Sequence, residues 1–342
     1  MGWHIGHTAV VEAYWVCEVV GRSPLPDDVK RLYFPETSPR NDRGAQLPSP
    51  GRLFSFCDQL QTDVQRRAHS LSVHDHELLR DDYLWHFLNQ HHWQHVEIMQ
   101  QVRHQRALRE HTPREVSSRA RARAPCLPTI RVPGSRLNVG SADANAFDNE
   151  CPPHVPALTA FLVSARPATN AEYLRFIHAG GYDTPAYWDP EGWAWRLKKN
   201  VQTPLHWRRT GNGAFYTVEI GGPAPLAEDL PVSGLSRYEA TAFARYAGCR
   251  LPHEHEWERA ARLGLLEETG KVWEWCANTL YAYPGFQPFP YERYSLPWLD
   301  GRHYVLRGGS VHTDACLRRP SFRNFYTADK RHVFAGVRLV QD

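Results

Sequence analysis

The composition of this chain changes sharply at a short stretch that is rich in proline and arginine. Residues 112–136 contain four Pro and six Arg against a single Glu. Gly and Pro are sparse inside the helix-like segments before this stretch, whereas Gly, Pro and Trp are frequent after it. Because Gly and Pro interrupt long helices, the two sides are expected to have different architectures. The pattern predicts two domains, 1–111 and 137–342, joined by a solvated linker at 112–136.

The first domain is predicted to be a helical bundle. Apolar residues recur at helical spacing in 6–20, 50–70 and 82–108. The segment 33–44, rich in turn formers, separates the first two helices. This arrangement is typical of a bundle with one long crossover connection.

The second domain is predicted to be an irregular α+β domain. Its clear helical patterns cover only 170–179, 236–246 and 254–263, and Asn170 and Ser236 are expected to be N-caps. The other segments resemble short strands within long loops.

The overall composition excludes several classes of protein. With 42% hydrophobic and 23% charged residues the chain is typical of a globular protein, and no apolar run is long enough for a membrane span. The net charge of +3 gives no reason to expect a nucleic-acid partner. Seven scattered cysteines without a CxxC pair favour a reducing, cytoplasmic location. No feature indicates the oligomeric state.

Histidines on two predicted helices suggest a metal site. His91 and His95 are four residues apart and therefore lie on one helix face. With 19 histidines, about one such pair is expected by chance, and Glu does not follow His91 as it does in zinc proteases. His7, near the start of the first helix, would be a third ligand if the bundle brought it alongside; otherwise it is an exposed polar residue. Three imidazoles would leave positions open on an iron ion.

These residues resemble a known family. The run from Trp3 to Ala9, followed by His91-x-x-Gln94-His95-x-Glu97, is similar to the DinB-type bundle of ergothioneine-pathway sulfoxide synthases. The resemblance implies a non-haem Fe(II) cofactor held by His7, His91 and His95. Members of the family carry a complete helix before the first ligand, whereas this chain begins almost at it. That difference leaves open a truncated or a shorter N-terminus.

The second domain resembles the formylglycine-generating-enzyme (sulfatase-modifying factor) domain, which has a C-type-lectin-like α+β fold. The resembling motifs occur in order at 148–154, 168–173, 180–182, 191–195, 250–257, 272–275, 307–310 and 334–338. Two further motifs, 284–291 and 319–326, are similar to the sulfoxide-synthase branch in particular. Formylglycine-generating enzymes bind copper through two Cys after the RGGS motif, but this chain has only Cys316 there, at a different spacing.

The resemblance implies an iron- and O2-dependent enzyme that joins sulfur to C2 of the imidazole of Nα-trimethylhistidine (hercynine) and oxidises it to a sulfoxide. Tyr326 and Lys330 differ from the γ-glutamylcysteine-using branch and favour cysteine or another chalcogen donor. Selenoneine synthases, which use a selenosugar, and ovothiol synthases are alternatives within the family. A non-catalytic lectin-like binding module and a zinc-dependent DinB thiol transferase are alternatives outside it.

The resemblance also implies roles for further residues. Gln94 would hydrogen-bond the substrate imidazole. Asn324 would hold the substrate carboxylate, and Phe325 and Tyr326 would line the trimethylammonium group. The pair Arg40 and Arg43 would bind the carboxylate of the donor. A tyrosine would act as proton donor, and Tyr33 is the first candidate and Tyr291 the second.

Overall fold

The computed structural model of the chain describes residues 1–111, 116, 120–134 and 137–342, which form two units, Met1–Val102 and Arg103–Asp342. The boundary lies inside helix α4 (Tyr83–Glu110) and not after residue 111 as the sequence predicted. The helix contains neither Gly nor Pro, so nothing local ends it at the boundary. Part of the predicted linker (112–115, 117–119 and 135–136) lies outside the described residues, and 130–132 form a strand.

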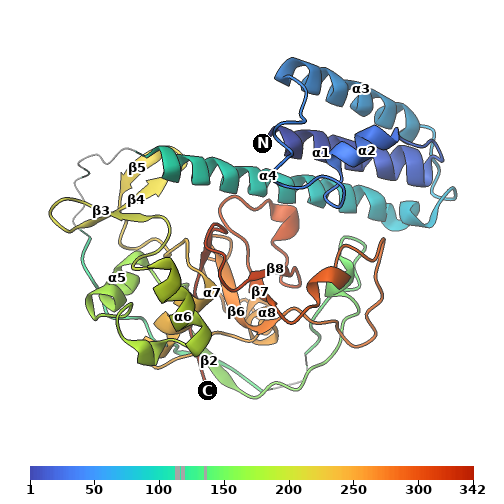
Figure 1. The fold of residues 1–342 in the computed structure, drawn as a ribbon. Helices are drawn as coiled ribbons and strands as arrows, with labels where there is room; N and C mark the ends of the chain where they lie inside the picture. The colour runs from blue at the N-terminus through green and yellow to red at the C-terminus, as the bar shows by residue number, and fades with distance from the viewer. Residues whose placement is uncertain (112–115, 117–119, 135–136) are drawn as a thin grey trace. The chain divides into compact units, whose positions relative to one another are not determined.

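The first unit is helical, as the sequence predicted (Figure 1). Its elements are α1 (Gly2–Ala13), the π-helix η1 (Tyr14–Val20), α2 (Asp27–Tyr33), α3 (Pro50–Ala68), the 3₁₀-helix η2 (Glu77–Asp82) and the first part of α4. Helix α2 was not predicted. It follows Pro26, has Asp27 and Asp28 in its first turn, and has two basic residues in its last turn, which suits the helix dipole. No helix among the described residues is both long and apolar enough to cross a membrane.

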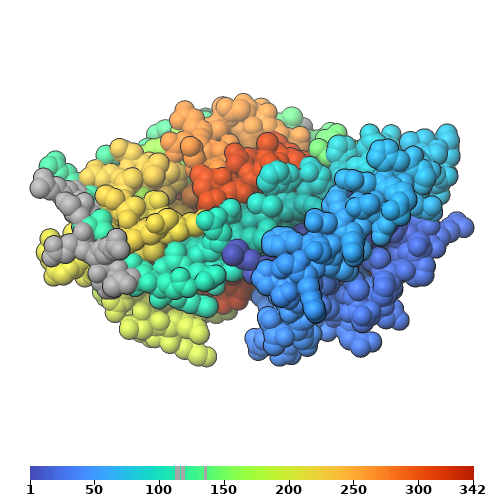
Figure 2. Space-filling model, turned by 90° about the horizontal axis from the view of Figure 1, so that it is seen from above, coloured from blue at the N-terminus to red at the C-terminus, as the bar shows by residue number. Residues whose placement is uncertain are grey.

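The core of the first unit lies where α1, α2 and α3 meet. Trp3, Val10, Tyr33 and Leu53 are buried there and are surrounded by partly buried apolar side chains. Helix α3 contributes the buried Leu53 and the partly buried Phe56, Cys57 and Leu60 to this core, while its outer side chains lie at the surface (Figure 2, blue). Burial of these apolar groups is the main term that holds α1 in place.

The described residues of the second unit form three small sheets (Figure 1). One has the order β1 (Ile130–Val132), β2 (Phe161–Val163), β10 (Val340–Gln341), and another joins β3 (Trp207–Arg209), β4 (Phe215–Glu219) and β5 (Gly222–Pro225). The third has the order β8 (Asn324–Thr327), β7 (His303–Arg307), β6 (Trp273–Thr279), β9 (Ala335–Gly336), and only its β6–β9 pair is parallel. Strand β8 therefore lies at a sheet edge.

The helices that begin in the second unit each start after a residue whose side chain caps the N-terminus. They are α5 (Asn170–His178), α6 (Pro190–Lys199), α7 (Arg237–Tyr246) and α8 (Glu254–Arg262). Ser236 caps α7 as predicted, but Thr169 and not Asn170 caps α5, because Thr169 accepts from the backbone N–H of Glu172 and the Glu172 carboxylate accepts in return. Helix α6 was not predicted, although Asp189 and Pro190 are typical start signals.

Buried ion pairs join the third sheet to α8. Arg307 on β7 and Arg323 both donate to the carboxylate of Glu254, and all three side chains are fully buried. Opposite charges compensate for the loss of water around each group. Arg323 directly precedes β8, so this network fixes the start of the strand that carries Asn324, Phe325 and Tyr326.

The expected α+β class, with an N-terminal helical region followed by a sheet-containing domain, is confirmed.

Candidate metal centre

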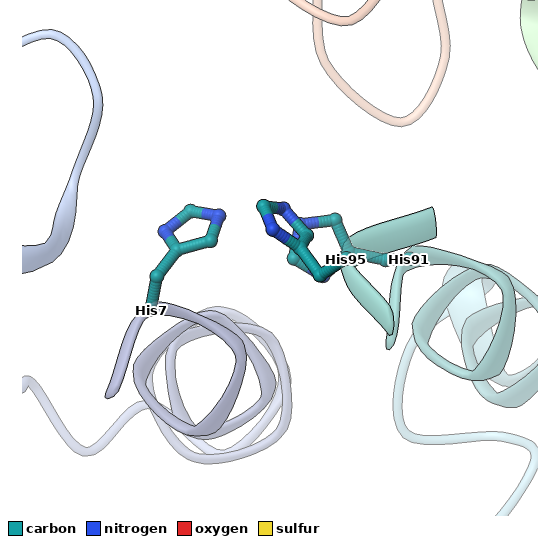
Figure 3. A group of neighbouring side chains, drawn as sticks. All are labelled: His7, His91 and His95. Carbon is teal, nitrogen blue, oxygen red and sulfur yellow. The ribbon is translucent and has the colours of Figure 1, made fainter. Parts of the chain in front are cut away.

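Three histidines of the first unit converge on one point. His7 projects from α1, and His91 and His95 project from one face of α4, so that the three rings face one another (Figure 3). One nitrogen from each ring lies within 4.8 Å of the others. The ring centroids are 4.6 Å apart for His7 and His95, 4.6 Å for His91 and His95, and 5.2 Å for His7 and His91.

Tyr33 and Trp3 hold the His7 ring in place. Its Nδ1 lies 2.7 Å from the carbonyl oxygen of Tyr33 at the end of α2. A carbonyl only accepts, so Nδ1 carries the proton and Nε2 presents its lone pair. The Trp3 ring stacks on His7 at 4.6 Å between centroids, with 10° between the planes. Gly6 lets α2 come this close, since a Cβ there would lie 2.1 Å from Cε1 of Tyr33.

The other two histidines differ in their neighbours. Nδ1 of His95 lies 3.0 Å from Nδ1 of His4, which is one turn before His7 on α1. Nδ1 of His91 is buried and has no hydrogen-bond partner. A buried polar atom without a partner is unusual and calls for an explanation such as an ion.

The environment keeps these imidazoles neutral at neutral pH. Burial lowers the pKa of His7 to about 4, although its hydrogen bond to Tyr33 acts in the opposite direction. Burial and the neighbouring histidines lower the pKa of His91 and of His95 well below the usual value. Neutral imidazole is the form that binds a metal, so no proton has to leave before a cation is bound.

The three residues therefore fit a metal ion. They supply three neutral imidazoles, and Nδ1 of His91 has no hydrogen-bond partner. Three protein ligands leave coordination positions for other molecules. Within the described part of the chain, no other group of His, Cys, Asp and Glu side chains converges in this way. Cys316 takes part in no such group, and burial raises its thiol pKa to about 12, which does not suit a copper ligand.

The segment between α2 and α3, which carries Arg40 and Arg43, contacts helix α1. The guanidinium of Arg43 lies 3.6 Å above the Trp3 ring, on the residue that stacks on His7, and its Nε donates to the Ser38 carbonyl. The indole N–H of Trp3 donates to the carbonyl of Leu32 and lies 3.2 Å from Ser38 Oγ. Arg40 is exposed, and neither arginine forms a salt bridge with a described carboxylate. Both guanidinium groups are available to an anionic ligand.

The other candidate residues of the first unit lie in different surroundings. The Tyr33 side chain is 2% exposed in the apolar core, and its hydroxyl has no hydrogen-bond partner. Its carbonyl, not its hydroxyl, contacts a candidate ligand. Gln94 is half-buried on α4, one residue before His95, and thus about 100° around the helix from it.

In the second unit, strand geometry separates the three neighbouring candidates. Asn324 and Tyr326 point to one face of β8, and Phe325 points to the other. Phe325 packs against Trp298 and the cluster that contains Val305, with 6.0 Å between the Phe325 and Trp298 ring centroids. Tyr291, the alternative proton donor, is 38% exposed in the loop after β6, beside Tyr294. Phe325 therefore does not share a face with Asn324.

The sequence motifs predicted no role for His4, Trp3 or the Tyr33 carbonyl. His4 could have been found from its position three residues before His7, which puts both on one helix face. The contact of Tyr33 had no comparable signal, since it depends on how α2 packs on α1.

Comparisons with known proteins agree with this two-part organisation. The family described as "Sulfatase-modifying factor enzyme 1-like domain" matches residues 113–269 and 262–342. The hercynine oxygenase of Mycobacterium tuberculosis is 30% identical over 99% of this chain and 90% of that protein. The hercynine oxygenase of Mycolicibacterium thermoresistibile is 31% identical over 99% of this chain and 86% of that protein. Ergothioneine biosynthesis protein 1 of Schizosaccharomyces pombe is 27% identical over 58% of this chain and 28% of that protein.

This chain combines a helical unit that holds three convergent histidines with a domain of the sulfatase-modifying factor enzyme 1-like family. It belongs to the family of the hercynine oxygenases, to which its similarity extends over almost the whole length. The resemblance drawn from the motifs is confirmed, and so is the expectation that the protein is an enzyme. The alternative of a non-catalytic binding module is wrong.

Proposed function

We propose that this enzyme is an iron(II)- and O2-dependent sulfoxide synthase of the ergothioneine pathway. It acts on C2 of the imidazole of Nα-trimethylhistidine (hercynine), with a cysteine-type thiol as sulfur donor. The C2–H and S–H bonds break, a C–S bond forms and one oxygen atom is added to sulfur, while the other leaves as water with both hydrogens. The observation that carries the proposal is the convergence of three neutral histidines in a member of the hercynine oxygenase family.

His7, His91 and His95 would hold the Fe(II). When bound, iron supplies the one-electron chemistry that lets O2 react with a thiol and an aromatic carbon. The residues around it then have the task of positioning the substrates. Gln94, on the same helix, would hydrogen-bond the substrate imidazole, since an amide can donate to or accept from either tautomer.

The substrate's amino-acid end would be bound by β8. Asn324 would hold its carboxylate, and Tyr326, on the same strand face, would contact its trimethylammonium group through its ring. Strand alternation favours Tyr326 over Phe325 for the second task. The donor's carboxylate would pair with Arg40 and Arg43, because guanidinium groups bind carboxylates through two parallel hydrogen bonds.

A tyrosine would provide the proton that the reduced oxygen requires. Burial raises the pKa of Tyr33, so its hydroxyl stays protonated at neutral pH. Tyr291 is the alternative. Replacing the tyrosine that donates the proton by Phe should shift the product from the sulfoxide toward the sulfinic acid of the donor while iron stays bound. Comparison of Tyr33→Phe with Tyr291→Phe identifies which of the two it is.

The proposal is tested by an aerobic assay of protein loaded with Fe(II). Hercynine is offered with cysteine, γ-glutamylcysteine or a selenosugar, histidine replaces hercynine in a further arm, and products are identified by mass spectrometry. We expect a hercynyl sulfoxide with cysteine, none without O2, and none from a His91→Ala variant that has lost its iron. Product with zinc alone would overturn the iron assignment, and product only with the selenosugar would overturn the sulfur assignment.

A further inference from the structure

His4 contacts His95, one of the three proposed ligands, but is not itself one of them. It lies on the first turn of α1, on the face that carries His7, and its Nδ1 is 3.0 Å from Nδ1 of His95. The two ring centroids are 5.2 Å apart, and the rings are inclined by 46°. Three ångströms is a hydrogen-bond distance for two nitrogens, so one of them must donate to the other.

The direction of this hydrogen bond follows from the chemistry of imidazole. A neutral ring has one N–H and one lone pair, and a nitrogen needs its lone pair to bind a metal. Nδ1 of His95 faces His4, so His95 can offer only Nε2 to a cation. Its proton is then on Nδ1, which donates to Nδ1 of His4. The proton of His4 is consequently on its own Nε2.

We propose that His4 is a positioning residue for the metal centre: its unprotonated Nδ1 accepts the Nδ1–H of His95 and thereby holds His95 with Nε2 toward the ion. The inference rests on the proposed assignment of His7, His91 and His95 as ligands.

A second contact of the same kind supports this role. His7 has the same arrangement, since its Nδ1–H donates to the Tyr33 carbonyl. Two of the three candidate ligands are thus oriented by acceptors behind them, one from the backbone and one from a side chain.

A matched pair of substitutions tests the proposal. His4→Asn places an acceptor oxygen on Cγ, where Nδ1 of His4 stood. His4→Leu introduces a side chain of nearly the same shape as Asn but without an acceptor. His86, exposed on α4, supplies the control variant His86→Leu. The full chain, freed of metal, is titrated anaerobically with Co(II) chloride, and both the affinity and the visible absorption of the bound ion are recorded.

We expect His4→Leu to bind Co(II) about 10- to 100-fold more weakly and with an altered absorption spectrum, as is typical for the loss of a residue that orients a metal ligand. His4→Asn should restore most of the affinity, and His86→Leu should bind as the wild type does. Equal binding by wild type and His4→Leu, or equal weakness of the Asn and Leu variants, would overturn the role of His4.

A second measurement uses the wild type and so does not depend on the folding of a variant. In zinc-loaded protein with ¹⁵N-labelled histidine, nuclear magnetic resonance reports which nitrogen of each ring carries a proton. We expect His95 to be protonated on Nδ1 and His4 on Nε2. A His4 ring that is protonated on Nδ1 excludes the proposal.

The controls separate this inference from the proposed function. If wild type and His7→Ala both fail to bind Co(II) or Fe(II), the metal centre itself is wrong. If wild type binds and His7→Ala does not, while His4→Leu is unaffected, only the role of His4 fails.

Discussion

Phe325 and Tyr326 are neighbours in the sequence, but strand β8 turns their side chains to opposite faces of its sheet. Phe325 packs with Trp298 and Leu299 against a buried cluster, whereas Tyr326 lies on the face of Asn324. We therefore expect Phe325 to contribute to stability and Tyr326 to substrate binding, and substitutions can separate the two effects.

We expect Phe325→Ala to lower the free energy of unfolding by about 2 kcal/mol, less than for a fully buried Phe. It should change the KM for hercynine and for histidine by the same factor. Tyr326→Ala should raise the KM for hercynine more than that for histidine, by about 2- to 30-fold, which corresponds to a cation–π contact. Tyr326→Phe, which keeps the ring, serves as control. A selective loss of hercynine binding in Phe325→Ala would contradict this assignment.

Tyr33 has a backbone carbonyl that accepts from His7 and a side-chain hydroxyl that has no hydrogen-bond partner. The carbonyl orients His7, and the hydroxyl is buried without a partner, which is costly. Tyr33→Phe should therefore leave the iron content unchanged and raise the free energy of unfolding by up to about 1 kcal/mol. Iron analysis and urea denaturation test both expectations. If the substitution removed iron, the hydroxyl and not the carbonyl would support the site.

At the scale of elements, the contact between α1 and α2 controls the geometry of His7. Gly6 is the residue that allows this contact, because the Tyr33 ring occupies the space that a Cβ would fill. Because Tyr33 ends α2, a shift of its ring also moves the carbonyl that holds His7.

Gly6→Ala should therefore weaken metal binding and destabilise the first unit, although alanine favours a helix over glycine. A Cβ added at Gly51, near the start of α3, would meet no atom within 4 Å, and Gly51→Ala should stabilise the protein by up to about 1 kcal/mol. Metal titration and thermal unfolding of both variants provide the comparison. Normal affinity in Gly6→Ala would mean that α1 tolerates a displacement of Tyr33.

At the scale of the whole molecule, the candidate ligands all belong to the unit Met1–Val102. A metal that binds only the folded state stabilises the part of the chain that holds it, by about 2.7 kcal/mol at a free concentration one hundred times the Kd. Hydrogen exchange should therefore slow in α1 and in the part of α4 before residue 103 when zinc is added, and should change little in 137–342. A slowing of equal size in both units would show that the two unfold together.

Stability should also depend on pH through the buried histidines. Burial lowers the pKa of His7 to about 4 and that of His255, in the second unit, to about 3. The unfolded chain binds a proton at each of these sites near pH 6.5, before the folded chain does. Their contribution is thus complete above pH 6.5 and is lost as the pH falls toward the folded-state values.

Metal-free protein should accordingly lose about 1.4 kcal/mol per pH unit for each such histidine below pH 6.5. Urea denaturation at pH 7, 6 and 5 measures this slope. A free energy of unfolding that stays constant or rises from pH 6.5 to pH 5 would show that these rings are already protonated in the folded protein.

The sequence alone determined the features that depend on local spacing. The apolar periodicity of α3 and α4, the one-face placement of His91 and His95, and the α+β class of the second unit follow from residues close together in the chain. That His7, His91 and His95 bind iron stays a prediction, although the structure brings them together.

Tertiary structure decided the features that depend on residues far apart in the chain. His4 meets His95 across 91 positions and His7 meets Tyr33 across 26, and neither pairing leaves a periodic signal. The short helix α2 and the strand β1 form because neighbours pack against them or pair with them. The same holds for Phe325, whose surroundings depend on the register of β8 with β7. The physical reason is that local spacing sets the direction of a side chain, whereas the packing of distant segments sets what it meets.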